Sequence, residues 1–568
     1  FYFPCGCSIA GYFLRGFCTL ALCELNIIDM KTLYSIALLL IFAINVFAQQ
    51  SGYTPELFSR AEKTNFAETS LSSDVRSFVN KLDELSDLVT VETFGHSFGG
   101  QELQLVIMAN PGISSPEEAK ASGKTVVYIQ ANIHAGEVEG KEATIKLMRE
   151  IAFEYKTYLL DNQIILFCPN YNPDGNDKLS ETNRRSQGGS PLLTGERSNG
   201  EGYDLNREGI KMEALEAKAL VKNVFNRWDP ALFVDLHTDN GSWHGYALNF
   251  APSFNSVGHP GPTLLTKNEL LPWVEKSVWE RTGVALWWHG YLRMREGQQA
   301  RFTGYSHLPR YVANYVGLRN RMGILSETFA HQIFEKRIVA TYLLVESVLN
   351  YTNDHAKEIL ETVKKADLET VETILTQAGK IKKGVRFQLT EEPELVEILV
   401  RETETYEDAN GRRRMRETGK IRWADSVMHY NSFVPVVSST VPRYYYFPAK
   451  LAAIADKLKE HGIRVDQLSK RNSVEGEVFK ITEFKKDQRS RYPGHNPVSL
   501  EGEFISKKKT FKSGDYRVDL AQPLAWLIFY MMEPQSDDGL VYWNYFDEYL
   551  ESKKAGEKEV EFPVLKAY

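Results

Sequence analysis

Four short runs of continuous apolar residues set the strongest limit on how this chain can fold. They are Thr125–Gln130, Gln163–Phe167, Ala231–Leu236 and Met322–Ser326. A strand buried on both faces has this pattern, whereas a half-exposed strand alternates apolar and polar residues. Stretches with helical periodicity lie between the runs, and strands that alternate with helices are typical of α/β domains. We therefore expect an α/β domain at residues 55–355, with a sheet flanked by helices.

Other segments complete the expected architecture. A turn-rich segment joins the strand-like runs Val89–Phe94 and Glu102–Ala109 and predicts a hairpin, so the expected sheet is mixed. Residues 356–382 are charged and helical in pattern, which suits a linker. Residues 383–568 contain short β-rich runs and predict a smaller, mostly-β accessory domain. Three aromatic residues of this domain offer a binding surface, but we interpret them as core: Trp526, Tyr542 and Trp543.

The N-terminal segment has the features of an export signal. Lys31 is followed by the apolar run Leu33–Phe47 and then by Ala48. A basic start, a short apolar core and a small residue are typical of a secretory signal peptide, which we place at residues 30–48. We interpret residues 1–29 as upstream sequence outside the natural product, with a membrane anchor as the alternative. We expect a secreted or periplasmic protein whose mature form has no stable membrane association.

Cysteine content and net charge narrow the class of protein further. Four of the five cysteines precede Met30, so only Cys168 remains after the expected cleavage and no internal disulfide can form. The net charge of −7 is mild for 568 residues. Because phosphate backbones require a basic surface, we do not expect nucleic acid as the main partner.

Metal-binding residue types follow two of the buried strands. His134 and Glu137 come directly after the first run, and His237 follows the third. Imidazole and carboxylate are good zinc ligands, and two His with one Glu leave an open position, as catalytic zinc sites do. An H-x-x-E pair alone is a weak indication, since a surface turn also explains it. His244 is the nearest competitor for the third ligand.

A carboxylate follows the fourth strand. Glu327 stands at the mouth of an apolar run, where a charged group is unfavourable unless it is paired or used. Such a group can take a proton from an attacking water and pass it to a leaving amine. A helix-capping role is the alternative.

The long loop before the third strand is rich in Arg and Asn. Asn206 and Arg207 suit a carboxylate ligand, because a guanidinium offers a bidentate fork. Another arginine of the loop suits the oxyanion of a tetrahedral intermediate. For any one of these arginines, a solvated surface position is the alternative.

Five motifs of this chain occur in the order of one known family. They are His134–Glu137, Asn172–Gly175, Asp204–Arg207, Asp235–His237 and Ser326–Glu327. In type and order they resemble the zinc carboxypeptidase family, the carboxypeptidase A-like metallopeptidases. The residues that follow resemble the C-terminal extension of some large bacterial members. The resemblance implies a carboxypeptidase-like catalytic domain at residues 55–355.

The resemblance also implies roles for individual residues. Glu327 is implied as general base and acid, and Asn206 and Arg207 as binders of the substrate's terminal carboxylate. The implied ligands of one zinc ion are His134, Glu137 and His237. The implied reaction is hydrolysis of the last peptide bond of a peptide with a free C-terminus.

Other family positions are matched less closely. The spacing in short-loop members places the oxyanion arginine at Arg197, whereas that of the digestive enzymes places it nearer Arg184 or Arg185. The mobile active-site tyrosine falls within residues 305–315. Gly136 stands where the digestive enzymes carry an arginine, so one secondary substrate contact is absent.

Three alternative functions remain open at this stage. The same site could act as a zinc amidase on cell-wall peptides or N-acyl amino acids. The chain could instead be an inactive binding module of the same fold. A carbohydrate- or surface-binding role could reside in the C-terminal domain.

Overall fold

The computed structural model describes most of the chain from Thr54 onwards. The described residues are 54–187, 191–239, 241–294, 298–408, 411–489, 492–554 and 560–568. The expected signal peptide at residues 30–48 and the segment before it lie outside this set. Among the described residues, no helix combines the length and apolar character needed to cross a membrane.

A mixed eight-stranded sheet forms the centre of the molecule, in the order β1-β2-β4-β3-β5-β10-β6-β7. The four apolar runs are the adjacent parallel strands β4, β3, β5 and β10. β1 and β2 form the expected hairpin. The bounds are β1 Val89–His96, β2 Glu102–Met108, β3 Thr125–Ala131, β4 Gln163–Cys168, β5 Leu232–Thr238, β6 Leu248–Pro252, β7 Leu286–Trp288 and β10 Met322–Thr328. The expected mixed α/β sheet is confirmed.

Both faces of this sheet are covered, which explains the continuous apolar runs. Val127 and Val234 belong to a core cluster on one face, whereas the neighbouring Tyr128 and Phe233 belong to the cluster on the other. Helices that pack on the first face are α4 (Ser72–Leu85), α6 (Glu139–Phe153), α10 (Leu271–Thr282) and α12 (Phe334–Asp354). The second face is covered by α8 (Leu215–Leu220), α11 (Val312–Leu318) and the C-terminal part of the chain.

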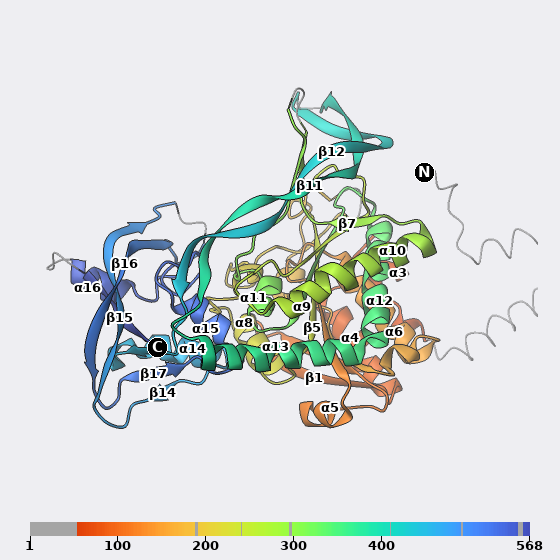
Figure 1. Cartoon of the computed structure of the whole chain (residues 1–568). Coiled ribbons are helices and arrows are strands. Elements are labelled where there is room, and N and C mark those ends of the chain that lie inside the picture. The colour runs from red at the N-terminus through yellow and green to blue at the C-terminus, as the bar shows by residue number, and fades with distance from the viewer. Residues whose placement is uncertain are drawn as a thin grey trace, which may run out of the picture.

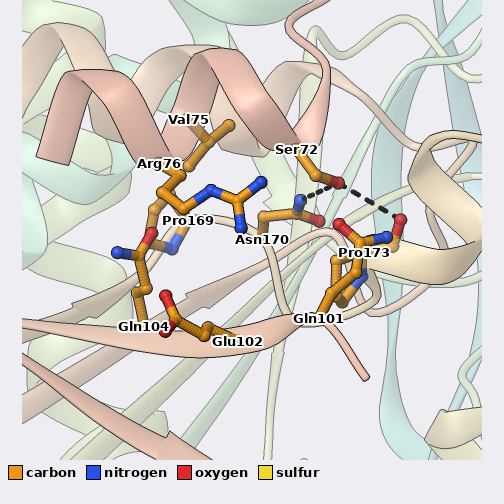
Figure 2. A pocket seen from close by; sticks show the side chains of 9 residues that line it. All are labelled: Ser72, Val75, Arg76, Gln101, Glu102, Gln104, Pro169, Asn170 and Pro173. Atoms are coloured by element: carbon orange, nitrogen blue, oxygen red, sulfur yellow. Dashed lines mark hydrogen bonds between the residues drawn. The ribbon is translucent and has the colours of Figure 1, made fainter. Parts of the chain in front are cut away.

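Short elements connect these layers. They are α3 (Arg60–Lys63), α5 (Pro116–Ser122), α7 (Pro173–Asn176) and α9 (Pro260–Leu265). Figure 2 shows how the turn after β4 is held against the start of α4: Asn170 Nδ2 donates to Ser72 Oγ (3.0 Å), and Ser72 Oγ donates to Pro173 O (3.2 Å). The small pocket drawn there contains none of the expected site residues.

Residues after the central sheet begin with α13 (Ala356–Gln377), where the sequence indicated a charged helix. Two very long strands follow, β11 (Lys382–Glu407) and β12 (Arg413–Thr440), paired as an antiparallel hairpin that we name the arm. Figure 1 shows the arm rising away from the rest of the molecule. The expectation of short runs is wrong here, because the outer part of the arm is exposed on both faces and has no apolar alternation.

A second sheet lies beyond the arm, in the order β14-β17-β13-β18-β15-β16. Its strands are β13 (Tyr444–Phe447), β14 (Asp466–Gln467), β15 (Asn472–Lys486), β16 (Val498–Phe511), β17 (Tyr516–Asp519) and β18 (Val560–Ala567). The helices are α14 (Ala452–Glu460), α15 (Ala525–Met532) and α16 (Asp547–Lys554). Trp526 and Trp543 are 2% and 1% exposed, so their interpretation as core is confirmed.

Candidate metal centre

Three side chains converge at the carboxyl edge of the central sheet. The Nδ1 atom of His134 lies 3.0 Å from Glu137 Oε1, and the Nδ1 atom of His237 lies 2.9 Å from Glu137 Oε2. The two Nδ1 atoms are 3.2 Å apart. Ligand atoms about 2.1 Å from a zinc ion in a tetrahedron lie about 3.4 Å from one another. The donor set and its spacing therefore fit a zinc ion.

Local structure places the ligands. His134 and Glu137 belong to a tight turn directly after β3, closed by a hydrogen bond from Glu137 N to His134 O (2.9 Å). His237 is the penultimate residue of β5, the strand next to β3. Because parallel strands end at the same edge of a sheet, the turn and the strand end meet there.

A carboxylate holds each imidazole from behind. Asp204 Oδ1 lies 3.0 Å from His134 Nε2, and Asp235 Oδ2 lies 3.0 Å from His237 Nε2. Such partners fix the ring orientation and leave the other ring nitrogen for a metal. Sequence reasoning gave neither aspartate a role, although Asp235 lies two residues before His237 and so shares its face of the strand.

Electrostatics keep Glu137 ionised. Burial alone would raise the pKa of this carboxyl, but His134 and Arg184 outweigh burial and hold the pKa well below its ordinary range. Arg184 Nη1 lies 3.0 Å from Glu137 Oε1, and Thr238 N donates to Glu137 Oε2 (3.1 Å). A carboxylate must be deprotonated to bind a metal, and this one is.

Glu327 lies beside the cluster. It is the register partner of His237 in the β5–β10 pair. Burial raises the pKa of Glu327 to about 8, and the nearby Glu137 and Asp239 act in the same direction, whereas His237 and Arg184 oppose it. A carboxyl whose pKa lies near neutrality can both accept and return a proton.

Two of the three candidate arginines reach the cluster. Arg197 Nη1 lies 3.6 Å from Glu137 Oε1, and Arg197 donates from Nε and Nη2 to Asp204 Oδ2 (3.0 and 2.9 Å). Arg184 is the second arginine that reaches the cluster, through its contact with Glu137. Arg185 is exposed. The structure thus favours Arg197 and Arg184 over Arg185 by position.

Asn206 and Arg207 also lie next to the cluster. Asn206 Nδ2 is 3.3 Å from His237 Nε2, and Asn206 Oδ1 accepts from Val312 N (3.1 Å). The Arg207 guanidinium lies 4.3 Å from the centre of the Tyr311 ring. A hollow beside Arg207 is lined by Arg197, Tyr311 and, from the C-terminal region, Tyr492. Tyr311 is thus the tyrosine of residues 305–315 that lines this hollow with Arg207.

A buried His–Glu–His cluster with a neighbouring carboxyl and arginines fits the active site of a metal-dependent hydrolase. Residues 75–209 match the family model described as "Zinc carboxypeptidase". This match places residues 75–209 in the zinc carboxypeptidase family, a family of peptide hydrolases, and the resemblance inferred from the motifs is confirmed.

Individual relatives are distant. Carboxypeptidase 2 of Trichophyton rubrum is 22% identical over 457 residues, which cover 77% of this chain and 78% of the relative. Human carboxypeptidase D is 30% identical over 144 residues, 24% of this chain and 9% of the relative. The crystal structure of a metallo-carboxypeptidase from Burkholderia cenocepacia aligns with a TM-score of 0.38 at 18% identity, covering 50% of this chain and 70% of that one.

Proposed function

We propose that this chain is a zinc-dependent metallocarboxypeptidase that hydrolyses the last peptide bond of peptides with a free C-terminus. The observation that carries the proposal is the convergence of His134, Glu137 and His237 beside Glu327. One zinc ion bound by the three ligands would supply Lewis acidity for the scissile carbonyl and for the attacking water.

Each remaining residue has a distinct part in the proposed reaction. Glu327 takes a proton from the attacking water and passes it to the leaving amine, as its raised pKa permits. Arg197 stabilises the negative charge that develops on the carbonyl oxygen, with Arg184 as the alternative donor. Asn206 and Arg207 bind the terminal carboxylate, which selects the last residue of a chain.

The proposal includes the setting of the enzyme. Export by a signal peptide at residues 30–48 rests on the sequence pattern alone. The proposed division has a catalytic domain at 55–355, a helical linker at 356–382 and an accessory domain at 383–568. It rests on the change of sequence pattern and on the separate eight- and six-stranded sheets, while the four-stranded sheet of the arm joins strands from both sides of the division.

A substrate panel tests the proposal directly. Natively purified protein is assayed on peptides with free C-termini, on the same peptides amidated, and on cell-wall peptides and N-acyl amino acids. We expect stepwise release of C-terminal residues, loss of activity on amidation, and loss with a chelator that added zinc reverses. His237→Ala should abolish both zinc and activity, whereas replacing the half-buried His355, which lies outside the cluster, by Ala should change neither.

Two outcomes would overturn the proposal. Equal cleavage of amidated peptides would exclude recognition of a terminal carboxylate. Absence of zinc from native protein, with no gain of activity when zinc is added, would favour an inactive binding module.

A further inference from the structure

A wide trough lies where the outer half of the arm meets the loop after β5. Its volume is about 790 Å³. One wall is the loop after β5, and the other walls are the arm and the short strand β8 (Tyr291–Arg293), which joins the sheet of the arm through β9 (Arg301–Thr303). Residues that characterise the trough are Trp243, Tyr291, Arg293, Arg401, Met415 and Arg422.

The trough is attached to the strand end that carries His237. The loop after β5 pairs with the arm through its backbone: Gly245 N donates to Leu399 O (2.7 Å), and Arg401 N donates to Trp243 O (3.1 Å). The two loop residues in these contacts, Trp243 and Gly245, follow His237 by six and eight residues. The arm is therefore fixed beside the proposed metal centre and is not a free extension at this point.

A second set of contacts joins the trough to the strand end that carries Glu327. Phe329 lies two residues after Glu327, and the Arg401 guanidinium lies 4.4 Å from the centre of its ring. His331, two residues further, stacks on Trp243 with centroids 4.0 Å apart and planes at 3°. The trough thus adjoins both strand ends that carry the proposed chemistry.

The charge of the trough indicates the chemistry of its occupant. Its lining includes three arginines, at 293, 401 and 422, but one acidic residue, Glu402, in a chain whose net charge is −7. The Arg401 side chain is 9% exposed, and although Nη1 donates to Glu417 (2.9 Å), its buried Nε has no hydrogen-bond partner. Acidic groups complement such a surface.

Apolar surface lies between the charges. Tyr291, Met294 and Met415 are 39%, 43% and 53% exposed. Exposed aromatic and methionine side chains in a groove are typical of surfaces that bind extended or variable peptides. The combination fits an acidic peptide segment better than a compact anion, which needs no apolar contact.

We infer that this trough binds the part of the peptide substrate upstream of the scissile bond and prefers acidic residues there. The inference rests on the proposed function. Only if Arg207 binds the C-terminal residue of the peptide do the preceding residues of the peptide extend towards the arm. The arm then selects among substrates without taking part in the chemical step.

Peptide length and charge test this inference. The substrates are an N-terminally blocked dipeptide and peptides of about ten residues that end in the same dipeptide. The long peptides carry either acidic or neutral residues upstream. They are long enough to extend into the trough, because each extended residue adds about 3.3 Å. The variant is the double substitution Arg293→Gln and Arg422→Gln. Its matched control at the tip of the arm is Arg412→Gln and Arg413→Gln, outside the trough.

We expect the acidic long peptide to have the lowest KM, and the trough variant to raise that KM about 5- to 10-fold, as the loss of two exposed charge pairs does. KM and kcat for the blocked dipeptide should stay unchanged, and about 0.5 M salt should weaken the preference for the acidic peptide. Arg401→Lys should weaken it also, since lysine has no Nε–H donor at that position.

The controls separate failure of the inference from failure of the proposed function. If neither the N-terminally blocked dipeptide nor any long peptide is cleaved, the proposed function is wrong. If the dipeptide is cleaved but the long acidic peptide has no lower KM, or if the tip variant has the same effect as the trough variant, the inference is wrong. An equal gain from the neutral peptide would show that the arginines do not select the substrate.

Discussion

At the scale of single residues, the candidate metal centre depends on the charged side chains that contact each proposed ligand. His134 and His237 each have an aspartate at Nε2, and Glu137 has Arg184 at 3.0 Å. The sequence could predict the three ligands, because His and Glu at the ends of buried strands have few other uses. It could not predict the contacts of Asp204 with His134 or of Arg184 with Glu137, because both residues belong to a long loop whose path no periodicity specifies.

Replacing Glu327 by Gln should separate metal binding from turnover. The amide keeps the size of the side chain but accepts no proton, so kcat should fall by about 10²- to 10⁴-fold. Zinc content, measured by elemental analysis, should remain that of the unmodified enzyme. Glu335→Gln, on the exposed side of α12, is the control. Near-normal turnover in the Glu327 variant would assign the base elsewhere.

The pH dependence should report the same carboxyl. A general base works only when it is deprotonated, so kcat/KM must fall as the pH drops through the pKa of Glu327. Burial raises that pKa from 4.5 to about 8, and the positive charge of a bound zinc ion lowers it again. We expect the acidic limb of the kcat/KM profile between these two values. A limb below pH 4.5 would contradict a buried base.

At the scale of elements, the predictable strands are those that bury both faces. β3, β4, β5 and β10 carry apolar residues on both faces, so the sequence predicted these strands and the order of the site residues at their ends. The arm could not be predicted in its length, because exposed paired strands carry charged residues on both faces and its pairing shifts register repeatedly. Tertiary contacts at its base decide its position.

The junction between α6 and the sheet should tolerate little change. A Cβ atom at Gly140 would lie 2.9 Å from Leu236 Cβ and 3.3 Å from Ala131 Cβ. Gly140→Val should therefore force α6 away from the ends of β3 and β5, lowering the free energy of unfolding by about 1–3 kcal/mol. Thermal unfolding measures the loss, with Lys146→Ala on the same helix as the control. A stability equal to that of the control would refute this close packing.

At the scale of the whole molecule, one apolar core joins the catalytic sheet to the C-terminal region. Buried residues of α11, α14 and α15 belong to the same cluster. Polar contacts cross the same boundary: Arg319 Nη1 donates to His461 O (3.0 Å), and Lys457 Nζ donates to Met212 O (3.0 Å). The sequence suggested two adjacent domains but held no information on how closely they share a core.

Removal of residues 378–568 should leave a chain that does not fold. The truncation exposes the buried apolar residues that share one core cluster with α14 and α15, and exposed patches of that kind lead to aggregation. Solubility on expression and circular dichroism measure the outcome, with the full chain as the reference. A soluble, active truncated enzyme would show that the second sheet is dispensable for folding.

The burial of Cys168 has a practical consequence for placing a spectroscopic label on the arm. Burial raises the pKa of this thiol to about 12, and it is the one cysteine among the described residues. Thiol reagents react with the thiolate, so this position should stay unlabelled in folded protein. A cysteine placed at an exposed arm position such as Thr418, in a chain that starts at Thr54, would then carry a single fluorophore or spin label. Because Thr418 lines the trough, the spectrum of the label would report a substrate that binds there.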